Sequence, residues 1–197
     1  MKYKEWSMPS GSPRVRQNLE AAGIPALLAA ILAARGITQP DQARRLLTPG
    51  AEPVLDPMLL RDRAAARVRR ALETGEHLAV YGDYDVDGIT STCLLTDCLR
   101  RMGGQVTPYI PDRLEEGYGL NLEAIHTLAD QGVTLIVTVD CGITAVEEVA
   151  FAAGLGVDVV VTDHHECKDP LPAAVAVVDP HRSDCLYPFK GLAGVGV

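Results

Sequence analysis

The stretch HLAVYGDYDVDGITS, residues 77 to 91, indicates how most of the chain folds. Its first five residues form a short apolar, β-prone run of the kind found in buried strands. Asp83, Asp85 and Asp87 follow at alternate positions, and Gly88 stands directly after the last of them. Like charges at this spacing repel one another, which costs free energy unless a cation compensates them. The stretch therefore predicts a strand followed by a metal-binding loop.

The order of strand and helix repeats along the chain after this stretch. Further β-rich apolar runs stand at residues 105–110, 133–140, 157–163 and 174–179, and helical patterns stand at 89–103, 121–132 and 144–156. Near-continuous apolar strands that alternate with helices are typical of a parallel sheet. The sequence thus predicts an α/β fold in which a parallel sheet carries helices on both faces.

Four of the predicted strands end in the same residue type. These residues are Asp83, Asp140, Asp163 and Asp179. The carboxyl ends of parallel strands lie at one edge of a sheet, where ligands bind, so the four side chains are expected to form one acidic pocket. His164 and His165 follow Asp163 directly. Oxygen-rich sites with one or two imidazoles suit Mn²⁺ or Mg²⁺.

Other interpretations of these motifs find less support in the sequence. An EF-hand loop also begins D-x-D-x-D-G, but its twelfth position requires a bidentate Glu and is Leu94 here. An apolar β-rich run also precedes the loop, where an EF-hand needs a helix. A solvated acidic turn stays open for residues 83–87 taken alone. A zinc site at His164, His165 and Cys167 has neither paired cysteines nor an H-E-x-x-H motif beside it.

The first 75 residues differ from the remainder in charge. They hold 12 Lys and Arg against 7 Asp and Glu, whereas residues 76–197 hold 6 against 19, so the net charges are +5 and −13. We expect a basic helical N-terminal region, residues 1–75, and then an α/β domain, residues 76–197, with the boundary near Thr74–Gly75. The arginines at 61–70 could follow a nucleic-acid backbone or form an ordinary solvated helix face.

Cysteine usage and hydropathy bear on the compartment. The five cysteines are odd in number and show no C-x-x-C spacing, which favours a reduced, cytoplasmic interior over a disulfide framework. Residues 1–13 show no signal-peptide pattern, and the longest apolar run, at residues 24–34, is too short to span a bilayer. We expect a cytoplasmic protein with no membrane segment.

Taken together, the motifs resemble the DHH phosphoesterase family. VYGDYDVDGITS at residues 80–91 is similar to the family's first motif, VTVDCGI at 137–143 to its second, and Asp-His-His at 163–165 to the third, which gives the family its name. PYIPDRLEEGYGLN at 108–121 and PFKGLAGVGV at 188–197 are similar to stretches found in the single-strand-specific exonucleases of this family. The resemblance covers nearly the whole chain.

The resemblance implies a site for two divalent ions, Mn²⁺ or Mg²⁺. The metal ligands that it implies are Asp83, Asp85, Asp87, Asp140 and His164, with Asp140 bridging the two ions. The catalytic residues that it implies are Asp163, His164 and His165. Among these, His165 would stabilise the scissile phosphate and Asp163 would orient the histidine pair. The ions would activate water, so that no protein nucleophile is needed.

The resemblance also implies an activity: 5′-to-3′ hydrolysis of single-stranded DNA to mononucleotides in recombination and repair. Single-stranded DNA would be the main partner, with a helicase and a single-strand binding protein as further ones, and we expect a monomer. Two alternatives remain. One is a phosphodiesterase of the same family for short oligoribonucleotides or cyclic dinucleotides, or a pyrophosphatase. The other is a catalytically inactive scaffold.

The family pattern extends beyond this chain. A further metal-binding aspartate and strand-binding domains would follow the GVG run near residue 197, so residues 76–197 are expected to be a truncated catalytic domain. Arg113, Tyr118 and Asn121 are candidates for nucleic-acid binding: the arginine would contact a phosphate and the tyrosine would stack on a base. Asn121 could instead cap the next helix. Residues 191–197 could form a tight turn near the phosphates or begin a helix.

Overall fold

The structure, a computed structural model, describes residues 11–48, 56, 59–60, 63–112, 117 and 119–197. The contacts divide the chain into two compact units, Met1–Leu55 and Asp56–Val197. In the first unit, helices α1 (Pro13–Ala21), α2 (Ala26–Ala34) and α3 (Pro40–Leu47) pack around a small core. The core consists of Leu19, Ile24, Ala29, Leu32 and Ala43. No helix in the described part of the chain has the length and apolar character needed to cross a bilayer.

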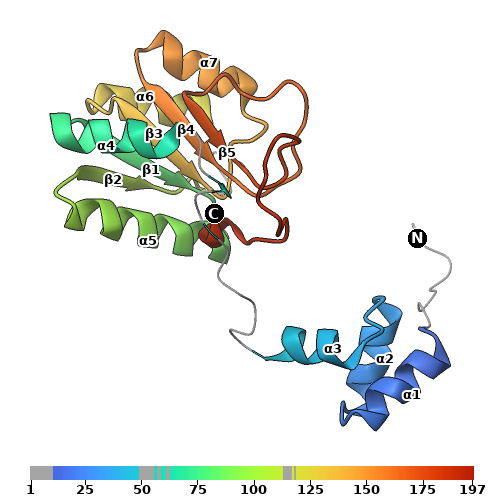
Figure 1. The fold of residues 1–197 in the computed structure, drawn as a ribbon. Coiled ribbons are helices and arrows are strands. Elements are labelled where there is room, and N and C mark those ends of the chain that lie inside the picture. Colours follow the sequence, from blue (N-terminus) through green and yellow to red (C-terminus); the bar gives the residue numbers. More distant parts are fainter. Residues whose placement is uncertain (1–10, 49–55, 57–58, 61–62, 113–116, 118) are drawn as a thin grey trace. The chain divides into compact units, whose positions relative to one another are not determined.

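The second unit alternates strands and helices as the sequence predicts. It contains α4 (Ala64–Thr74), β1 (His77–Gly82), α5 (Val86–Arg101), β2 (Gln105–Tyr109), α6 (Leu122–Asp130), β3 (Leu135–Val139), α7 (Val146–Gly154), β4 (Asp158–Thr162), β5 (Ala176–Val178) and the short 3₁₀ helix η2 (Gly194–Gly196). The strands form one sheet in the order β2-β1-β3-β4-β5, and every pair is parallel (Figure 1). The predicted α/β fold class is confirmed.

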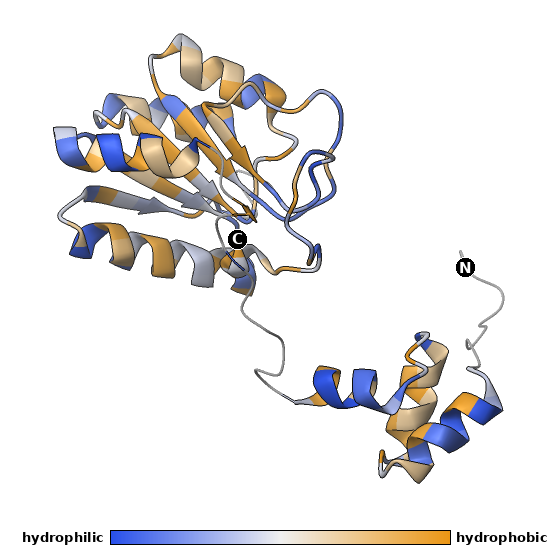
Figure 2. Ribbon diagram, in the orientation of Figure 1, coloured by the Kyte–Doolittle hydropathy of each residue, from blue (hydrophilic) through white to orange (hydrophobic). Residues whose placement is uncertain are grey.

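Helices cover both faces of the sheet because successive strand residues point to opposite sides. On β1, Leu78 and Val80 face one core and Ala79 and Tyr81 face the other. The first core lies under α4 and α5, and the second lies under α6 and α7 (Figure 1). The inner strands are largely apolar along their length, as their colour in Figure 2 shows, because neither face of the sheet meets water.

Helix α4 belongs to the second unit, although the change in charge along the sequence suggested a boundary near residue 75. The contacts divide the chain between Leu55 and Asp56 instead. Ala71 of α4 is fully buried against the sheet. Charge is therefore a poor guide to this boundary, because exposed arginines, Arg63, Arg69 and Arg70, stand on or next to a helix whose other side is core.

Arg67 ties α4 to the sheet. Its guanidinium donates to both carboxylate oxygens of Glu76, at 3.2 and 2.6 Å, and its Nε donates to Asp158 Oδ2 at 2.6 Å. The arginine is largely buried, and its hydrogen bond with Glu76 lowers the pKa of that carboxyl group. One side chain thus joins the helix to the start of β1 and to the start of β4.

Replacing Arg67 by methionine is expected to lower the free energy of unfolding by about 1–3 kcal/mol. Methionine retains the apolar stem but leaves Glu76 without its charged donors, and hydrogen bonds to charged groups are worth about that much. Urea unfolding followed by circular dichroism would measure the loss. Arg70→Met on the same helix is the control, because Arg70 is exposed and its loss should cost less than about 0.5 kcal/mol. Equal effects of the two variants would contradict this role of Arg67.

Candidate metal centre

The register of the sheet places four aspartates in one row. Gly82 of β1 pairs with Val139 of β3, Val139 with Thr162 of β4, and Thr162 with Val178 of β5. The residues that follow these four are Asp83, Asp140, Asp163 and Asp179. All four are at most 3% exposed. Carboxylates that are far apart in the sequence are thus buried side by side at the carboxyl edge of the sheet.

The loop from Asp83 to Asp87 connects β1 to α5. The side chain of Asp85 caps the helix, since its Oδ1 accepts hydrogen bonds from the backbone N–H of Asp87 at 2.9 Å and of Gly88 at 3.0 Å. The bond from Gly88 is the main cause that lowers the pKa of Asp85 and keeps it ionised. Gly88 is required at this turn because a Cβ there would lie 2.4 Å from the carbonyl oxygen of Asp83. The strand β1 precedes the loop, as the sequence predicts, whereas an EF-hand loop would follow a helix.

Asp140 is a strongly perturbed carboxylate of the row. It adopts a left-handed backbone conformation, with φ of 61°, and is 2% exposed. Burial, followed by the charges of Asp87 and Asp85, raises its pKa to about 6. Its Oδ1 is buried and receives no hydrogen bond from the residues that the structure describes. An orphaned carboxylate oxygen in this position fits a metal ligand.

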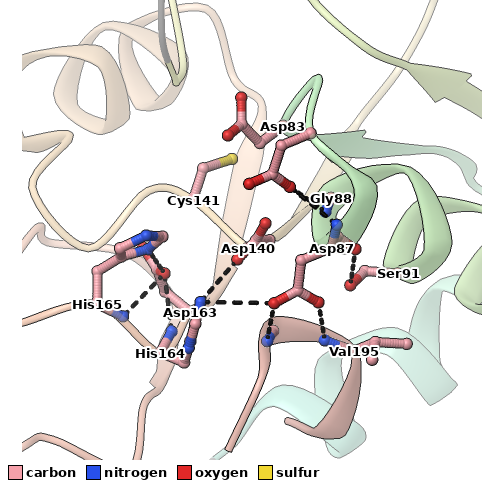
Figure 3. Close-up of polar contacts among 12 residues, drawn as sticks. Asp83, Asp87, Gly88, Ser91, Asp140, Cys141, Asp163, His164, His165 and Val195 are labelled. Carbon is pink, nitrogen blue, oxygen red and sulfur yellow. Dashed lines mark hydrogen bonds and ion pairs between the residues drawn. The ribbon is translucent and has the colours of Figure 1, made fainter.

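The Nε2 atom of His164 faces that oxygen. Its Nδ1 lies 2.8 Å from the carbonyl oxygen of Leu192, and since a carbonyl only accepts, Nδ1 carries the proton. A neutral ring then has a lone pair on Nε2, which lies 2.9 Å from Asp140 Oδ1 (Figure 3). Two acceptors at this distance repel one another unless a proton or a metal ion lies between them.

Asp163 holds the two histidines in place. Its Oδ1 accepts hydrogen bonds from the backbone N–H of His164 and of His165, and it also contacts His165 Nδ1 at 2.7 Å. Its Oδ2 accepts from the N–H of Ile143 at 2.9 Å. Burial lowers the pKa of His165, but the hydrogen bond and the charge of Asp163 outweigh this effect and raise it. The orientation leaves His165 Nε2 directed away from Asp163.

Two sets of ligand atoms lie close enough together to hold an ion each. One set is Asp83, Asp85 and Asp140, the other is Asp140, His164 and His165, and within each set the atoms lie within 4.8 Å of one another. Asp140 belongs to both. A carboxylate shared by two ligand sets is the arrangement that a pair of bridged divalent ions requires. Carboxylate and imidazole donors together suit Mn²⁺ and Mg²⁺.

Asp87 stands beside these sets and has backbone partners of its own. Its two oxygens accept hydrogen bonds from the N–H of Gly194 at 2.7 Å and of Val195 at 2.8 Å. Its Oδ2 lies 3.6 Å from His164 Nε2 (Figure 3). The sequence motif placed Asp87 among the ligands, and the structure adds that its carboxylate also fastens the η2 turn. Its role as a ligand stays a prediction.

Asp179 lies in the row of aspartates but joins neither ligand set. Its Oδ1 accepts a hydrogen bond from the N–H of His181 at 2.7 Å, and burial raises its pKa to about 6.

No cysteine belongs to the ligand sets found among the described residues. Burial raises the pKa of the Cys141 thiol well above its ordinary value and that of Cys167 to about 11, so neither thiol is a ready metal ligand.

The candidate contacts to nucleic acid are only partly visible. Arg113 and Tyr118 lie outside the described residues. Asn121 caps α6, since its Oδ1 accepts from the N–H of Ala124 at 2.7 Å, and its amide donates to the hydroxyl of Tyr81 at 3.1 Å. The side chain of Asn121 thus has a structural task in the fold, and a contact to nucleic acid stays a prediction.

Sequence reasoning missed the backbone groups of the site. The Leu192 carbonyl and the N–H groups of Gly194 and Val195 contact the side chains of His164 and Asp87. Main-chain groups have no signature in a residue motif. The only signal was the glycine-rich run at residues 191–197, for which the sequence left open a tight turn near the phosphates or the start of a helix. The structure has the short 3₁₀ turn η2 there.

Comparison with known proteins agrees with this geometry. Residues 77–197 match the profile of the DHH family, N-terminal domain. These residues include both ligand sets and the entire sheet. The chain belongs to the DHH family.

Proteins named RecJ are among the relatives with similar sequences. The single-stranded-DNA-specific exonuclease RecJ of Bacillus subtilis (strain 168) is 42% identical over 186 residues, which are 93% of this chain and 24% of that protein. A crystal structure of RecJ from Thermus thermophilus in complex with Mn²⁺ is 30% identical, with a TM-score of 0.63 over 95% of this chain and 26% of that one. A crystal structure of exonuclease RecJ bound to manganese is 38% identical, also with a TM-score of 0.63, over 74% of this chain and 36% of that one. The chain spans about a quarter of the length of the curated relative.

Proposed function

We propose that this chain forms the metal-binding part of an exonuclease that hydrolyses single-stranded DNA from its 5′ end to mononucleotides, with Mn²⁺ or Mg²⁺ as the cofactor. A protein named RecJ is 42% identical to this chain over 93% of its length. Two RecJ structures with the same fold contain manganese. The proposal places the activity in DNA recombination and repair.

One observation carries the proposal: Asp140 belongs to both ligand sets and directs a buried, unsatisfied oxygen at His164 Nε2. A turn at residues 83–87 that was only a solvated loop would not bury Asp83, nor bring Asp83 and Asp85 within 4.8 Å of the buried Asp140. A catalytically inactive scaffold would have no need to keep Asp140 ionised at a free-energy cost. The cost is reasonable if divalent ions compensate it.

In the proposed site, each side chain has a distinct task. Asp83 and Asp85 would hold one ion, His164 would hold the other through Nε2, and Asp140 would hold both. When bound, the ions supply a water nucleophile at neutral pH and neutralise charge on the phosphate. Asp163 keeps the histidines oriented and does not touch the substrate. This chain therefore provides no protein nucleophile.

His165 would act on the phosphate. Its Nδ1–H donates a hydrogen bond to Asp163, and the raised pKa of His165 keeps its ring charged to a higher pH than the ring of a free histidine. A charged imidazole would donate from Nε2 to a phosphate oxygen as negative charge develops there, a contribution that is largest in a preorganised site.

We also propose that the protein acts in the cytoplasm as a monomer, beside a helicase and a single-strand binding protein. All five cysteines are free, in keeping with a reducing compartment. A hydrolase for dinucleotides or pyrophosphate has no comparable support, because the relatives with high identity are named as exonucleases.

A nuclease assay on the protein that carries this chain tests the proposal. With Mn²⁺, a 5′-labelled single strand should release its label as a mononucleotide from the first turnovers, and a 3′-labelled strand should shorten stepwise. EDTA should stop both reactions, and a duplex with blunt ends should be degraded much more slowly. Release of the label first from the 3′ end would contradict the polarity. Turnover of short oligoribonucleotides alone would contradict the substrate.

A further inference from the structure

We propose that the backbone of Leu192–Val195 is a positioning element of the metal centre. It sets the geometry of three side chains of the proposed site, which are Asp87 of α5, Asp140 after β3 and His164 after β4. The inference rests on the proposed metal site and goes beyond it. Neither the aspartate motifs nor the histidine pair assign any task to this segment. Its contacts with the site come from main-chain atoms and from the absence of a side chain at Gly194.

The first contact fixes a tautomer. The carbonyl of Leu192 accepts the proton on His164 Nδ1 at 2.8 Å, so the lone pair of the neutral ring must lie on Nε2, the nitrogen that faces Asp140. Without this acceptor the ring could carry its proton on either nitrogen. Hydrogen bonds to the second nitrogen of a metal-bound histidine commonly select the tautomer and the ring orientation.

The second contact orients Asp87. The N–H groups of Gly194 and Val195 bind one carboxylate oxygen each, at 2.7 and 2.8 Å, so the plane of the carboxylate is fixed by two bonds (Figure 3). These donors also stabilise negative charge beside the buried Asp140 without adding a basic side chain. Each oxygen keeps a further lone pair that could face an ion.

The third contact depends on Gly194 having no side chain. A Cβ at this position would lie 2.6 Å from Asp140 Oδ1 and 2.8 Å from its Cβ and Cγ. Asp140 is itself buried at the end of β3 and has no room to withdraw. The η2 turn can therefore approach the shared ligand only with glycine at residue 194, and any larger residue would push the whole segment outward.

The three contacts act together because they come from one short segment. Displacing η2 would release the acceptor of His164 and both donors of Asp87 at once. The expected consequence is a loss of metal affinity of about 10- to 100-fold, the usual effect of removing groups that orient metal ligands. The chain would remain folded, since most of its core lies elsewhere.

Gly194→Ala and Gly196→Ala form a matched pair for the test. A Cβ at Gly196 would meet only the Leu192 side chain, with its Cδ2 at 3.3 Å and its Cβ at an ordinary 3.8 Å, so this variant controls for the loss of a glycine in the same turn. Titration calorimetry with Mn²⁺ alone should show about 10- to 100-fold weaker binding for Gly194→Ala and less than about threefold change for Gly196→Ala. Equal affinities of Gly194→Ala and the unaltered protein would overturn the inference.

A second measurement needs no metal. In metal-free protein, the proton on His164 Nδ1 should exchange slowly with water because the Leu192 carbonyl accepts it, and in Gly194→Ala this exchange, followed by NMR, should be faster. An unchanged rate of exchange would overturn the inference. This holds even if the unaltered protein proved unable to bind Mn²⁺, a result that would count against the proposed function alone. If Gly194→Ala fails to fold, Val195→Pro is the second variant to test. Proline has no N–H, so this variant removes one hydrogen bond to Asp87 and adds no atom beside Asp140. It should weaken Mn²⁺ binding, and unchanged binding would equally overturn the inference.

Discussion

Asp140→Asn is expected to abolish Mn²⁺-dependent hydrolysis and to make the metal-free protein more stable. Asparagine tolerates the left-handed backbone at this position and fits the same space, which alanine would not do equally well. It cannot bridge two cations as a carboxylate does. Both ligand sets lose their shared member, so activity should fall to background and the increase in thermal midpoint on adding Mn²⁺ should disappear.

The gain in stability follows from the raised pKa of Asp140. Its pKa is about 6 in the folded protein against an ordinary value of 3.8, so between these pH values the folded state keeps a proton that the unfolded state has lost. The stability of metal-free protein therefore falls as the pH rises from about 4 to about 6. At pH 7.5 the neutral amide should recover roughly 2–3 kcal/mol, at about 1.4 kcal/mol per pKa unit.

Thermal unfolding in EDTA at pH 4 and at pH 7.5 measures this effect. The variant and the unaltered protein should have similar midpoints at pH 4 and separate at pH 7.5, with the variant higher by a few degrees. Asp97→Asn, on the exposed side of α5, is the control and should change neither activity nor pH dependence. A variant that unfolds at a lower temperature than the unaltered protein at pH 7.5 would show that Asp140 is not under electrostatic strain.

His165→Ala is expected to lower the rate of hydrolysis by about 10²- to 10³-fold while Mn²⁺ affinity changes by less than about tenfold. The loss is that of one preorganised donor to the developing negative charge. His165 is about half exposed, in contrast to the buried Asp140, so it can reach a substrate. Single-turnover hydrolysis and calorimetry on the same preparation separate the two quantities.

The same experiment distinguishes two tasks for His165. Its ring also belongs to a ligand set with Asp140 and His164, so a fall in Mn²⁺ affinity parallel to the fall in rate would identify it as a metal ligand instead. His126→Ala is the matched control, because His126 is exposed on α6 and is paired only with Asp130 among the contacts described. That variant should retain full activity and affinity.

Much of the fold could be predicted because its determinants are local. The apolar runs at residues 133–140 and 157–163 have the length and composition of buried strands, and they form β3 and β4. The boundary before α4 could not be predicted in the same way. In the sequence, Arg67 cannot be distinguished from the other arginines of a basic helix. Only its pairing with Glu76 and Asp158 shows that this helix packs on the sheet.

The site divides in a similar manner. Alternate aspartates after one strand, an aspartate after each of three others and a histidine pair are enough to predict an acidic pocket, because parallel strands end at one edge. The sequence could not show that Asp179 stays outside the ligand sets or that Asp87 fastens a turn. Those outcomes depend on small differences in distance that only the packed chain sets.

The sequence by itself determines that carboxylates are gathered and buried in this protein, because the order and register of apolar strands set which residues meet at the edge of the sheet. Only the tertiary structure decides which of them face a common ion. That choice is made by main-chain groups, such as the Leu192 carbonyl and the Gly194 N–H, which nearly every residue carries and no motif records. Their positions follow from the packing of segments more than a hundred residues apart in the chain, as the bond from Gly194 to Asp87 shows.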